Sequence, residues 1–355
     1  MVRLNFSFGK FGYGVASAGA GSPALLARDA RRLSCSVMAS IDTLGADYRT
    51  ITEACGLLDR SERGKLALTG SEARSFLQGQ VTNDVEALAA GRGCYAAFLT
   101  PKGKMLGDLR ILATDDELLL DTERVALQGL FNMIRRFSIG YDMELHKRTL
   151  ECGLLSLIGP GAAVMAGAGD FASDEHAHTV VDVPGTGVSA RAIRTDIGVD
   201  LLCDAAETDA LRAALEEAGA PAVAEAAVEC VRVERGRPRY GLDLDDSVIP
   251  QEAGLNERAV SFTKGCYVGQ ETVARLYYRG KPNRQLRGLR LSGPAASGDE
   301  LSFEGRVVGR LASVAESPRL GPIALALVRR EAPPGTTVEV ADDGSVTGEV
   351  IELPF

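Results

Sequence analysis

Residues that bind metals or form disulfides are scarce in this sequence. Its seven cysteines are scattered, their number is odd, and no two of them form a CxxC pair. This pattern predicts free thiols in a reducing cytoplasm. Only three histidines are present, and none stands beside a cysteine at ligand spacing, so we expect no metal site.

Long apolar runs are also absent. The uncharged run at residues 153–169 is interrupted by Gly159, Pro160 and Gly161, and it is too short to cross a bilayer. We therefore expect no membrane partner. The same run predicts a buried strand, Leu154–Ile158, followed by a turn and a short helix.

Positive charge is in the minority overall but is concentrated in two segments. The net charge of −9 disfavours nucleic-acid binding by the protein as a whole. Residues 264–290, however, contain seven basic residues and one acid, Glu271, and residues 232–239 contain four arginines and one acid, Glu234. These segments predict either a local site for an anionic ligand or solvated faces that balance the charge.

The length and composition predict a folded protein of two or three domains. The chain has 355 residues, of which 45% are hydrophobic and 25% charged. Residues 1–37 are rich in Gly and Ser and carry five basic residues against one acid. We expect them to form a poorly ordered tail. A transit peptide has a similar composition, and Met38 is an alternative true start.

Strand and helix patterns are mixed over residues 38–282 without a strict βαβ order, which predicts an α+β fold. The pattern predicts helices at 42–58, 71–76, 123–137, 207–218 and 222–233, strands at 64–70 and 117–120, and a hairpin at 95–112 around Pro101–Lys104. Residues 283–355 contain short apolar runs separated by Gly, Pro, Asp and Ser, which predict a small C-terminal β-barrel.

The segment Lys264–Arg275 concentrates chemically special residues. Gly265 and Gly269 permit close backbone approach, and a helix is expected from Gln270 onward. Cys266 would then precede a helix N-terminus two residues from Lys264, and both features favour a thiolate. The alternatives are a reactive or ligand-binding thiol and a small buried apolar side chain.

The same segment, KGCYVGQETVAR, resembles the signature of the YgfZ family of folate-binding proteins. That family is similar in fold to the aminomethyltransferase (T-protein) of glycine cleavage and is related to a mitochondrial iron–sulfur cluster assembly factor. Four other stretches agree with it in order along the chain and extend the resemblance over about residues 40–355. They are GLLDRSERGKLALTGSEARSFLQGQVTND from Gly56, YAAFLTPKGKMLGDLRI from Tyr95, RVERGRPRYGLDL from Arg232 and IPQEAGL from Ile249.

The resemblance implies three subdomains around a tetrahydrofolate site, the last of them a small β-barrel. It further implies a cytoplasmic protein that supports the assembly or repair of iron–sulfur clusters in client enzymes, including radical enzymes that modify tRNA. The cysteines lack ferredoxin-like spacing, so we expect no cluster of its own.

The resemblance also implies site residues. Glu234 matches the glutamate that pairs with the pterin ring, since a carboxylate accepts two parallel hydrogen bonds from such a ring. T-proteins have two adjacent aspartates after the hairpin; here Gly107 replaces the first, while Asp108 remains as a general base or a group that holds an amine. Cys266 is expected to carry a redox or cluster-related step. The other candidate folate-binding residues are Lys264, Tyr267, Gly269, Gln270, Glu271 and Arg275.

Other interpretations stay open. A folate-dependent aminomethyltransferase is supported by Asp108 and Glu234 and opposed by Gly107. An RNA-binding module would use Tyr277 and Tyr278 as stacking platforms, but the net charge of −9 disfavours it. We expect at least two of the three tyrosines 267, 277 and 278 to pack in the core. Gln270 and Glu271 also fit simple helix capping, and Glu271 and Arg275 fit an i,i+4 ion pair.

Overall fold

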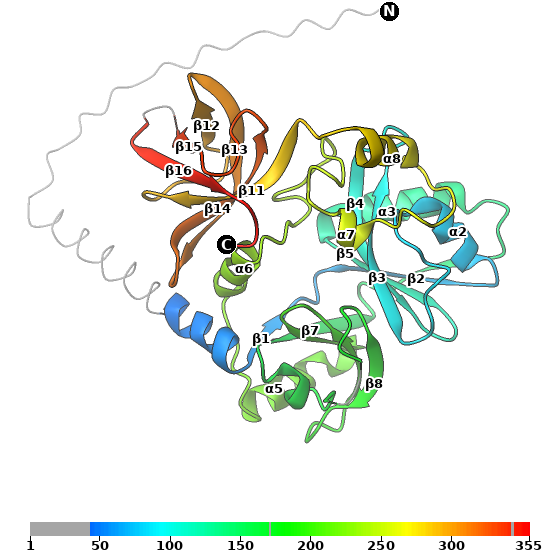
Figure 1. Cartoon of the computed structure of the whole chain (residues 1–355). Helices are drawn as coiled ribbons and strands as arrows, with labels where there is room; N and C mark the ends of the chain where they lie inside the picture. Colours follow the sequence, from blue (N-terminus) through cyan, green and yellow to red (C-terminus); the bar gives the residue numbers. More distant parts are fainter. Residues whose placement is uncertain (1–42, 170–171, 342–343) are drawn as a thin grey trace, which may run out of the picture. The chain divides into compact units, whose positions relative to one another are not determined.

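Figure 1 shows a computed structural model of the chain, which describes residues 43–169, 172–341 and 344–355. The tail expected over residues 1–37 lies outside these ranges. Residues 44–355 form one unit by their contacts. This unit combines two antiparallel sheets and a closed barrel with helices, which confirms the α+β class.

The first sheet has one apolar and one polar face. Its strand order is β3-β4-β5-β2-β6. The bounds are Gly64–Thr69 for β2, Arg92–Leu99 for β3, Met105–Ala113 for β4, Leu118–Thr122 for β5 and Glu144–Lys147 for β6. In β4, Leu109 and Ile111 pack under helices α2 (Ala73–Gln80) and α3 (Arg124–Phe137). Successive side chains of a strand point to opposite faces, so Asp108 and Arg110 lie on the opposite, polar face.

The second sheet also has one apolar and one polar face. Its strand order is β1-β7-β10-β9-β8. The bounds are Gly56–Asp59 for β1, Cys152–Ile158 for β7, His178–Asp182 for β8, Ser189–Arg194 for β9 and Gly198–Asp204 for β10. Helices α4 (Ala162–Met165) and α5 (Thr208–Glu217), the latter preceded by the 3₁₀ turn η1 (Ala205–Glu207), contribute to the apolar core on one face. Ser156 and Asp200 lie opposite each other on the other face. The predicted strand, turn and short helix after Leu154 are confirmed.

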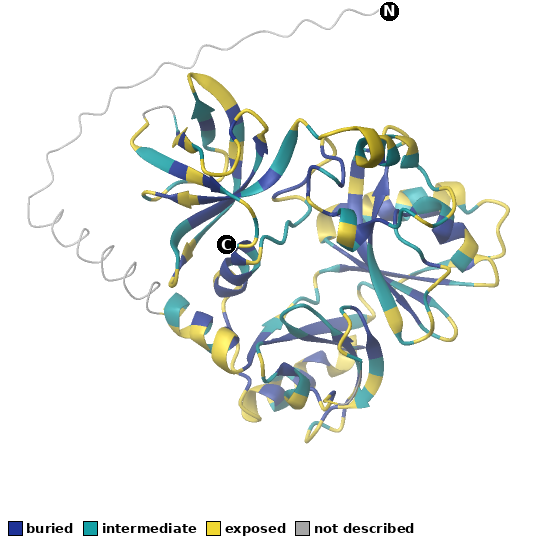
Figure 2. Ribbon diagram, in the orientation of Figure 1, coloured by how far each residue is buried: buried dark blue, intermediate teal, exposed yellow. Residues whose placement is uncertain are grey.

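The C-terminal strands close the expected barrel. Its strand order is β11-β14-β13-β12-β15-β16. The bounds are Arg284–Leu291, Glu300–Phe303, Arg306–Ser317, Gly321–Arg329, Thr337–Val340 and Val346–Ile351 for β11 to β16. Buried apolar side chains form its core. In Figure 2 the barrel strands carry dark blue segments, which mark buried residues, among teal and yellow ones. Helix α6 (Glu225–Glu234) packs on β13 and β14, and its Val233 belongs to one buried apolar cluster with Ile323 and Leu325 of β14.

Two predicted helices differ from the observed ones. The first runs over residues 43–53 and not to Leu58, because Leu57 is buried in the second sheet's core as part of β1, which pairs with β7. The helix expected to be capped by Ser71 begins at Ala73, because the Ser71 hydroxyl donates to Asp142 Oδ2 at 2.6 Å.

The tyrosines near helix α8 (Gln270–Arg279) also differ from expectation. Tyr277 and Tyr278 are 50% and 67% exposed, so the expected core packing of at least two of the three tyrosines was wrong. Helix α8 buries only Val273, which leaves Tyr277 stacked on Phe262 at 3.8 Å between ring centroids. Helix α7 (Asn256–Ala259) precedes this region. Among the described residues, no helix has the length and apolar content needed to cross a membrane.

Candidate functional site

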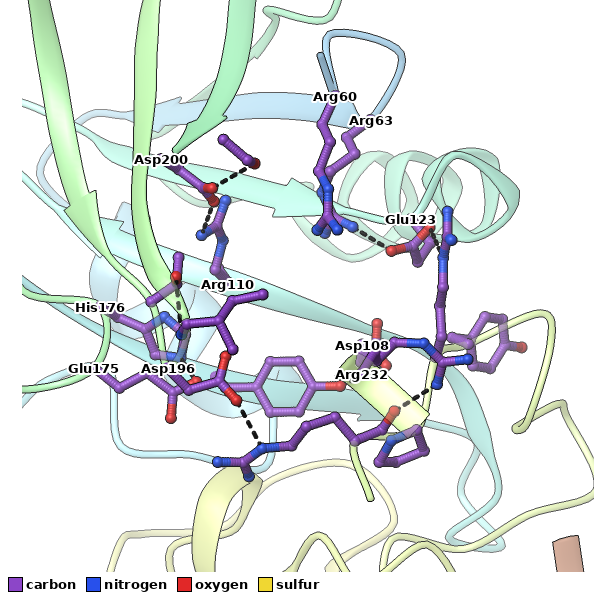
Figure 3. A pocket seen from close by; sticks show the side chains of 18 of the residues that line it. Arg60, Arg63, Asp108, Arg110, Glu123, Glu175, His176, Asp196, Asp200 and Arg232 are labelled. Carbon is purple, nitrogen blue, oxygen red and sulfur yellow. Dashed lines mark hydrogen bonds and ion pairs between the residues drawn. The ribbon is translucent and has the colours of Figure 1, made fainter. Parts of the chain in front are cut away.

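A cavity of about 180 Å³ lies between the polar faces of the two sheets, beside residues 237–240 (Figure 3). Seven arginines line it: Arg60, Arg63, Arg110, Arg232, Arg237, Arg239 and Arg258. Six carboxylates also line it: Asp108, Glu123, Glu175, Asp196, Asp200 and Glu229. Within the described ranges, no group of three or more His, Cys, Asp or Glu side chains is arranged to hold a metal ion.

Asp108 is a buried carboxyl in the wall of this cavity. Its residue is 4% exposed, and the Tyr95 hydroxyl donates to its Oδ2 at 2.6 Å. Both side chains lie on the polar face of the β3–β4 hairpin, where Tyr95 pairs with Arg110. Burial raises the pKa of Asp108 to about 6, although the bond from Tyr95 acts in the opposite direction. No hydrogen bond among the described residues uses Oδ1, so this carboxyl can accept from a ligand.

A buried ion-pair network in the wall of the cavity connects the two sheets. Arg110 of β4 donates to Asp121 of β5 and to Asp200 of β10, each at 2.6 Å. Arg63 donates to the second oxygen of Asp121 at 2.8 Å, and Ser156 donates to Asp200 at 2.6 Å. Burial alone would raise the pKa of Asp121, but the two guanidinium groups outweigh it and hold that pKa well below its usual range. The network fixes the cavity walls in position.

Three polar side chains that line the cavity keep a buried atom without a partner in the described part of the chain, Arg258 through its Nε. Nε of Arg60 and Nδ1 of His176 are buried and form no hydrogen bond within the described part of the chain. Arg60 also forms no ion pair there, in contrast to Arg63 and Arg110. His176 is 7% exposed. Buried polar atoms are nearly always hydrogen-bonded, so this part of the cavity wall has unsatisfied hydrogen-bonding capacity.

Glu234 lies outside this cavity, in the wall of an adjoining cavity of about 910 Å³. Its carboxylate accepts hydrogen bonds from the Tyr48 hydroxyl at 2.9 and 3.1 Å, from Ser317 at 2.5 Å and from Arg319 at 3.3 Å. Both oxygens therefore already hold partners from the helix 43–53 and from the barrel. We define Tyr48, Glu234, Ser317 and Arg319 as the Glu234 clamp.

The Glu234 clamp predicts a stability effect. Glu234→Ala would leave the buried Tyr48 hydroxyl and Ser317 without their acceptor, so the free energy of unfolding in urea should fall by about 2 kcal/mol. Tyr48→Phe removes only one donor and should cost about 1 kcal/mol. A loss below about 0.5 kcal/mol in Glu234→Ala would show that these bonds do not stabilise the fold.

The segment 264–275 packs against the β3–β4 turn and does not line the cavity. Lys264 Nζ donates to the carbonyl oxygens of Gln78, Val81 and Asn83 at 2.5, 2.8 and 2.9 Å, and burial lowers its pKa to about 8. Gly269 has φ +85°, and a Cβ there would lie 2.6 Å from the Thr100 carbonyl oxygen. Only glycine allows this approach. The segment thus supports the hairpin that carries Asp108.

The remaining signature residues divide between packing and exposure. Burial raises the pKa of Tyr267 to about 12, and the Tyr267 backbone N–H donates to Gln270 Oε1 at 3.3 Å, as in helix capping. Cys266, Glu271 and Arg275 are exposed. Within the described residues, no ion pair joins Glu271 to Arg275. The structure therefore separates the predicted site residues into Asp108 in the cavity, Glu234 in the adjoining cavity and the signature at the hairpin turn.

Gly107 is excluded from carrying a larger side chain. A Cβ at this position would lie 2.6 Å from the Phe98 ring and 2.8 Å from Ala126 Cβ. Because neighbours in a strand point to opposite faces, position 107 faces the apolar core while Asp108 faces the cavity. Asp108 is therefore the acidic side chain that this part of β4 points toward the cavity.

Sequence reasoning found Asp108 but missed other residues of the cavity wall. Tyr95 and Arg110 share a strand face with Asp108, so polar residues at a spacing of two in apolar strands were an available signal. Arg60 lies in a stretch that carried the resemblance. No sequence signal pointed to His176, which lies before β8.

Two antiparallel sheets followed by a closed C-terminal barrel match the class of the glycine cleavage T-protein. The family model of the GCVT N-terminal domain matches residues 36–264, and that of the glycine cleavage T-protein C-terminal barrel domain matches residues 284–355. The chain belongs to the GcvT family.

Relatives of known name agree with this family. An aminomethyltransferase of Streptomyces avermitilis is 31% identical over 329 residues, which cover 87% of this chain and 88% of that protein. A chloroplastic protein of Arabidopsis thaliana named as a transferase is 28% identical over 84% of this chain and 71% of its own length. The crystal structure of aminomethyltransferase T from Bartonella henselae has a TM-score of 0.77 at 24% identity, with 88% and 89% of the two chains covered. The expected aminomethyltransferase-like fold is confirmed.

Proposed function

We propose that this protein binds tetrahydrofolate in the cavity beside Asp108 and that it supports the assembly or repair of iron–sulfur clusters in client enzymes, including enzymes that modify tRNA. Members of the GcvT family use tetrahydrofolate as substrate or cofactor, and this chain belongs to that family. The observation that carries the folate half is the buried Asp108 carboxyl, with one oxygen held by Tyr95 and the other available.

The cavity residues fit a pterin ring. Such a ring presents an amino group and ring N–H groups as donors and a carbonyl as an acceptor. Asp108 can accept from the donors, and Arg60 can donate to the carbonyl oxygen. We assign pterin recognition to Asp108 and not to Glu234, because both Glu234 oxygens are already bonded within the Glu234 clamp. When bound, tetrahydrofolate would supply N5 and N10, the nitrogens that accept and carry one-carbon units.

The two cavities together fit a ring with an acidic tail. A volume of about 180 Å³ is below the range of roughly 300–1,000 Å³ usual for whole ligands, so we place the ring there. The adjoining cavity of about 910 Å³ shares Ile158 and residues 195–197 with the first. Arg235 and Arg319 line it. These guanidinium groups suit the glutamate tail that folates carry.

The iron–sulfur half of the proposal is supported by the resemblance of residues 264–275 to the YgfZ signature and by the exposure of Cys266. An exposed thiol can meet a client protein, whereas a buried one cannot. A cytoplasmic location, as the free thiols predict, belongs to the same proposal. Complementation of cells that lack the protein, with wild type or Cys266→Ser, tests it through the activity of cluster-dependent enzymes.

An aminomethyltransferase is the second candidate, favoured by the 31% identity to the Streptomyces avermitilis enzyme. The two candidate functions differ in whether the protein catalyses a reaction of the bound folate. A transferase would release ammonia when supplied with tetrahydrofolate and an aminomethyl donor, whereas a maintenance factor would bind folate without releasing ammonia.

Calorimetric titration with tetrahydrofolate under anaerobic conditions tests the binding site. The wild type should bind, and Arg60→Gln should weaken binding about 3- to 10-fold because the shorter, uncharged glutamine donates less strongly to the ring carbonyl. Arg306→Gln, on an exposed barrel residue away from both cavities, should bind as the wild type does. Absence of wild-type binding would overturn the proposed function.

A further inference from the structure

A further cavity lies at the end of the barrel where β11 begins and β14 ends (Figure 1). Its volume is about 210 Å³, and it shares no lining residue with the two cavities described above. Four of its lining residues are arginines, Arg284, Arg287, Arg329 and Arg330, and none of its described lining residues is acidic. In a chain of net charge −9, a wall of this composition favours an anionic ligand.

Strand pairing brings two of these arginines together. Arg284 and Arg329 are directly opposite each other in the antiparallel pair of β11 and β14. Opposite residues share a face of the sheet, and like charges there are destabilising. The Arg284 guanidinium is compensated, because it donates to the Glu252 carboxylate at 3.1 Å and to Ser247 Oγ at 3.0 Å. Arg329 is compensated less, since its Nε lies 3.8 Å from the Glu331 carboxylate and both side chains are more than half exposed.

Arg287 and Arg330 also keep donors that a ligand can use. The Arg287 guanidinium donates to Gln285 Oε1 and lies 3.8 Å from Glu352, whose side chain is 76% exposed. The Arg330 side chain is exposed and forms no hydrogen bond or ion pair with the described residues. Exposed ion pairs at such distances neutralise little charge. The guanidinium groups of Arg287, Arg329 and Arg330 therefore reach solvent with N–H donors that the fold does not use.

The backbone holds the wall of this cavity in a fixed shape. The Arg330 N–H donates to the Asn283 carbonyl oxygen at 3.0 Å, which continues the pairing past the ends of β11 and β14. Ala332 is buried, and Pro333 and Pro334 follow it in the wall, where each proline ring fixes its φ. A wall that is already ordered lowers the entropy cost of binding a ligand.

We propose that this barrel-end cavity binds a phosphate group, either as the free ion or as a small phosphate monoester. Guanidinium groups match phosphate oxygens in geometry and hold them by charge-assisted hydrogen bonds. Three guanidinium groups can surround the three free oxygens of a monoester, whereas a carboxylate offers only two oxygens. The site is independent of the proposed folate site, with which it shares no lining residue.

Calorimetric titration of the full chain with inorganic phosphate and with glycerol 3-phosphate, at constant ionic strength in chloride, tests this site. The wild type should bind at least one of the two probes with a Kd below about 1 mM. Arg330→Gln should weaken that binding about 10-fold, because a charged donor is lost. Arg330→Lys keeps the charge without the planar fork and should weaken binding less than Arg330→Gln.

A matched variant separates a site from the general charge of the barrel. Arg290 is an exposed residue of β11 outside the cavity, so Arg290→Gln removes the same charge and should bind both probes as the wild type does. Thermal unfolding of each variant verifies that it is folded. Absence of binding by both probes in the wild type, or equal losses in Arg330→Gln and Arg290→Gln, would overturn the proposal.

The two probes also distinguish the sources of the phosphate group. Binding of inorganic phosphate alone would assign the cavity to the free ion. Equal or tighter binding of glycerol 3-phosphate would assign it to a phosphorylated small molecule whose remaining atoms lie outside the cavity. Tetrahydrofolate affinity should be unchanged in Arg330→Gln, because Arg330 lines neither of the other two cavities.

Discussion

Replacing Arg110 with methionine should lower the free energy of unfolding by about 3–5 kcal/mol. The Arg110 guanidinium is 10% exposed and is bonded to Asp121 and Asp200, so its removal leaves Asp200 without its cation and Asp121 with only Arg63. An uncompensated buried carboxylate is costly because little water reaches it. Urea unfolding monitored by circular dichroism measures the loss.

A matched surface pair separates burial from ion pairing. Arg310 and Glu300 are bonded on the barrel, with side chains 65% and 32% exposed. Arg310→Met should cost less than about 1 kcal/mol, since exposed pairs contribute little. Equal losses in the two variants would contradict the argument. The double variant Arg110→Met with Asp200→Leu should recover part of the loss, because it also removes the buried Asp200 carboxylate that Arg110→Met leaves without a cation.

The loss of stability at low pH should depend on the same ion-pair network. The folded-state pKa of Asp121 is held below its unfolded value of about 3.9, so the folded state binds fewer protons. Its stabilising contribution is therefore complete above that unfolded value and is lost as the pH falls further. Arg110→Met should show a smaller loss of stability below about pH 4 than the wild type, because the pKa of Asp121 is then lowered less in the folded state.

The fold could be predicted where the signal is local. The β3–β4 hairpin follows from two apolar runs around Pro101–Lys104, and α3 follows from apolar residues at helical spacing. The barrel follows from short apolar runs between turn residues. The misjudged helix end near Leu58 depends on pairing with β7, about 100 residues away in sequence, which no local pattern encodes.

The site could be predicted only in part, because it is assembled across the two sheets. Asp108 was visible through the resemblance, but its partner Tyr95 and the bridge from Arg110 to Asp200 depend on how the sheets face each other. Glu234 illustrates the same limit. A carboxylate in a matching motif predicts a ligand contact, yet its hydrogen bonds go to Tyr48 and Ser317, which the motif does not contain.

Asp108→Asn should weaken tetrahydrofolate binding about 10- to 150-fold. The carboxylate is the charged acceptor for the pterin donors, and a hydrogen bond to a charged group contributes about 1.5–3 kcal/mol. Asparagine keeps the size and can still accept from Tyr95, so the variant should fold like the wild type. Calorimetric titration at pH 7.5 measures the affinity. Tyr95→Phe leaves the carboxylate in place, so its affinity for tetrahydrofolate should fall less than that of Asp108→Asn.

The pH dependence of tetrahydrofolate affinity tests whether Asp108 is the group that binds the ligand. Burial raises its pKa to about 6, so the acceptor form is depleted as the pH falls through that value. Wild-type affinity should therefore weaken from pH 7.5 to pH 5, while Asp108→Asn should show no such change beyond that of the ligand's own ionisation. The other charged groups that act on Asp108 are Arg63, Asp121 and Glu123, and all three are retained in the variant. A parallel pH profile in the two proteins would assign the effect to another group and remove Asp108 from pterin recognition.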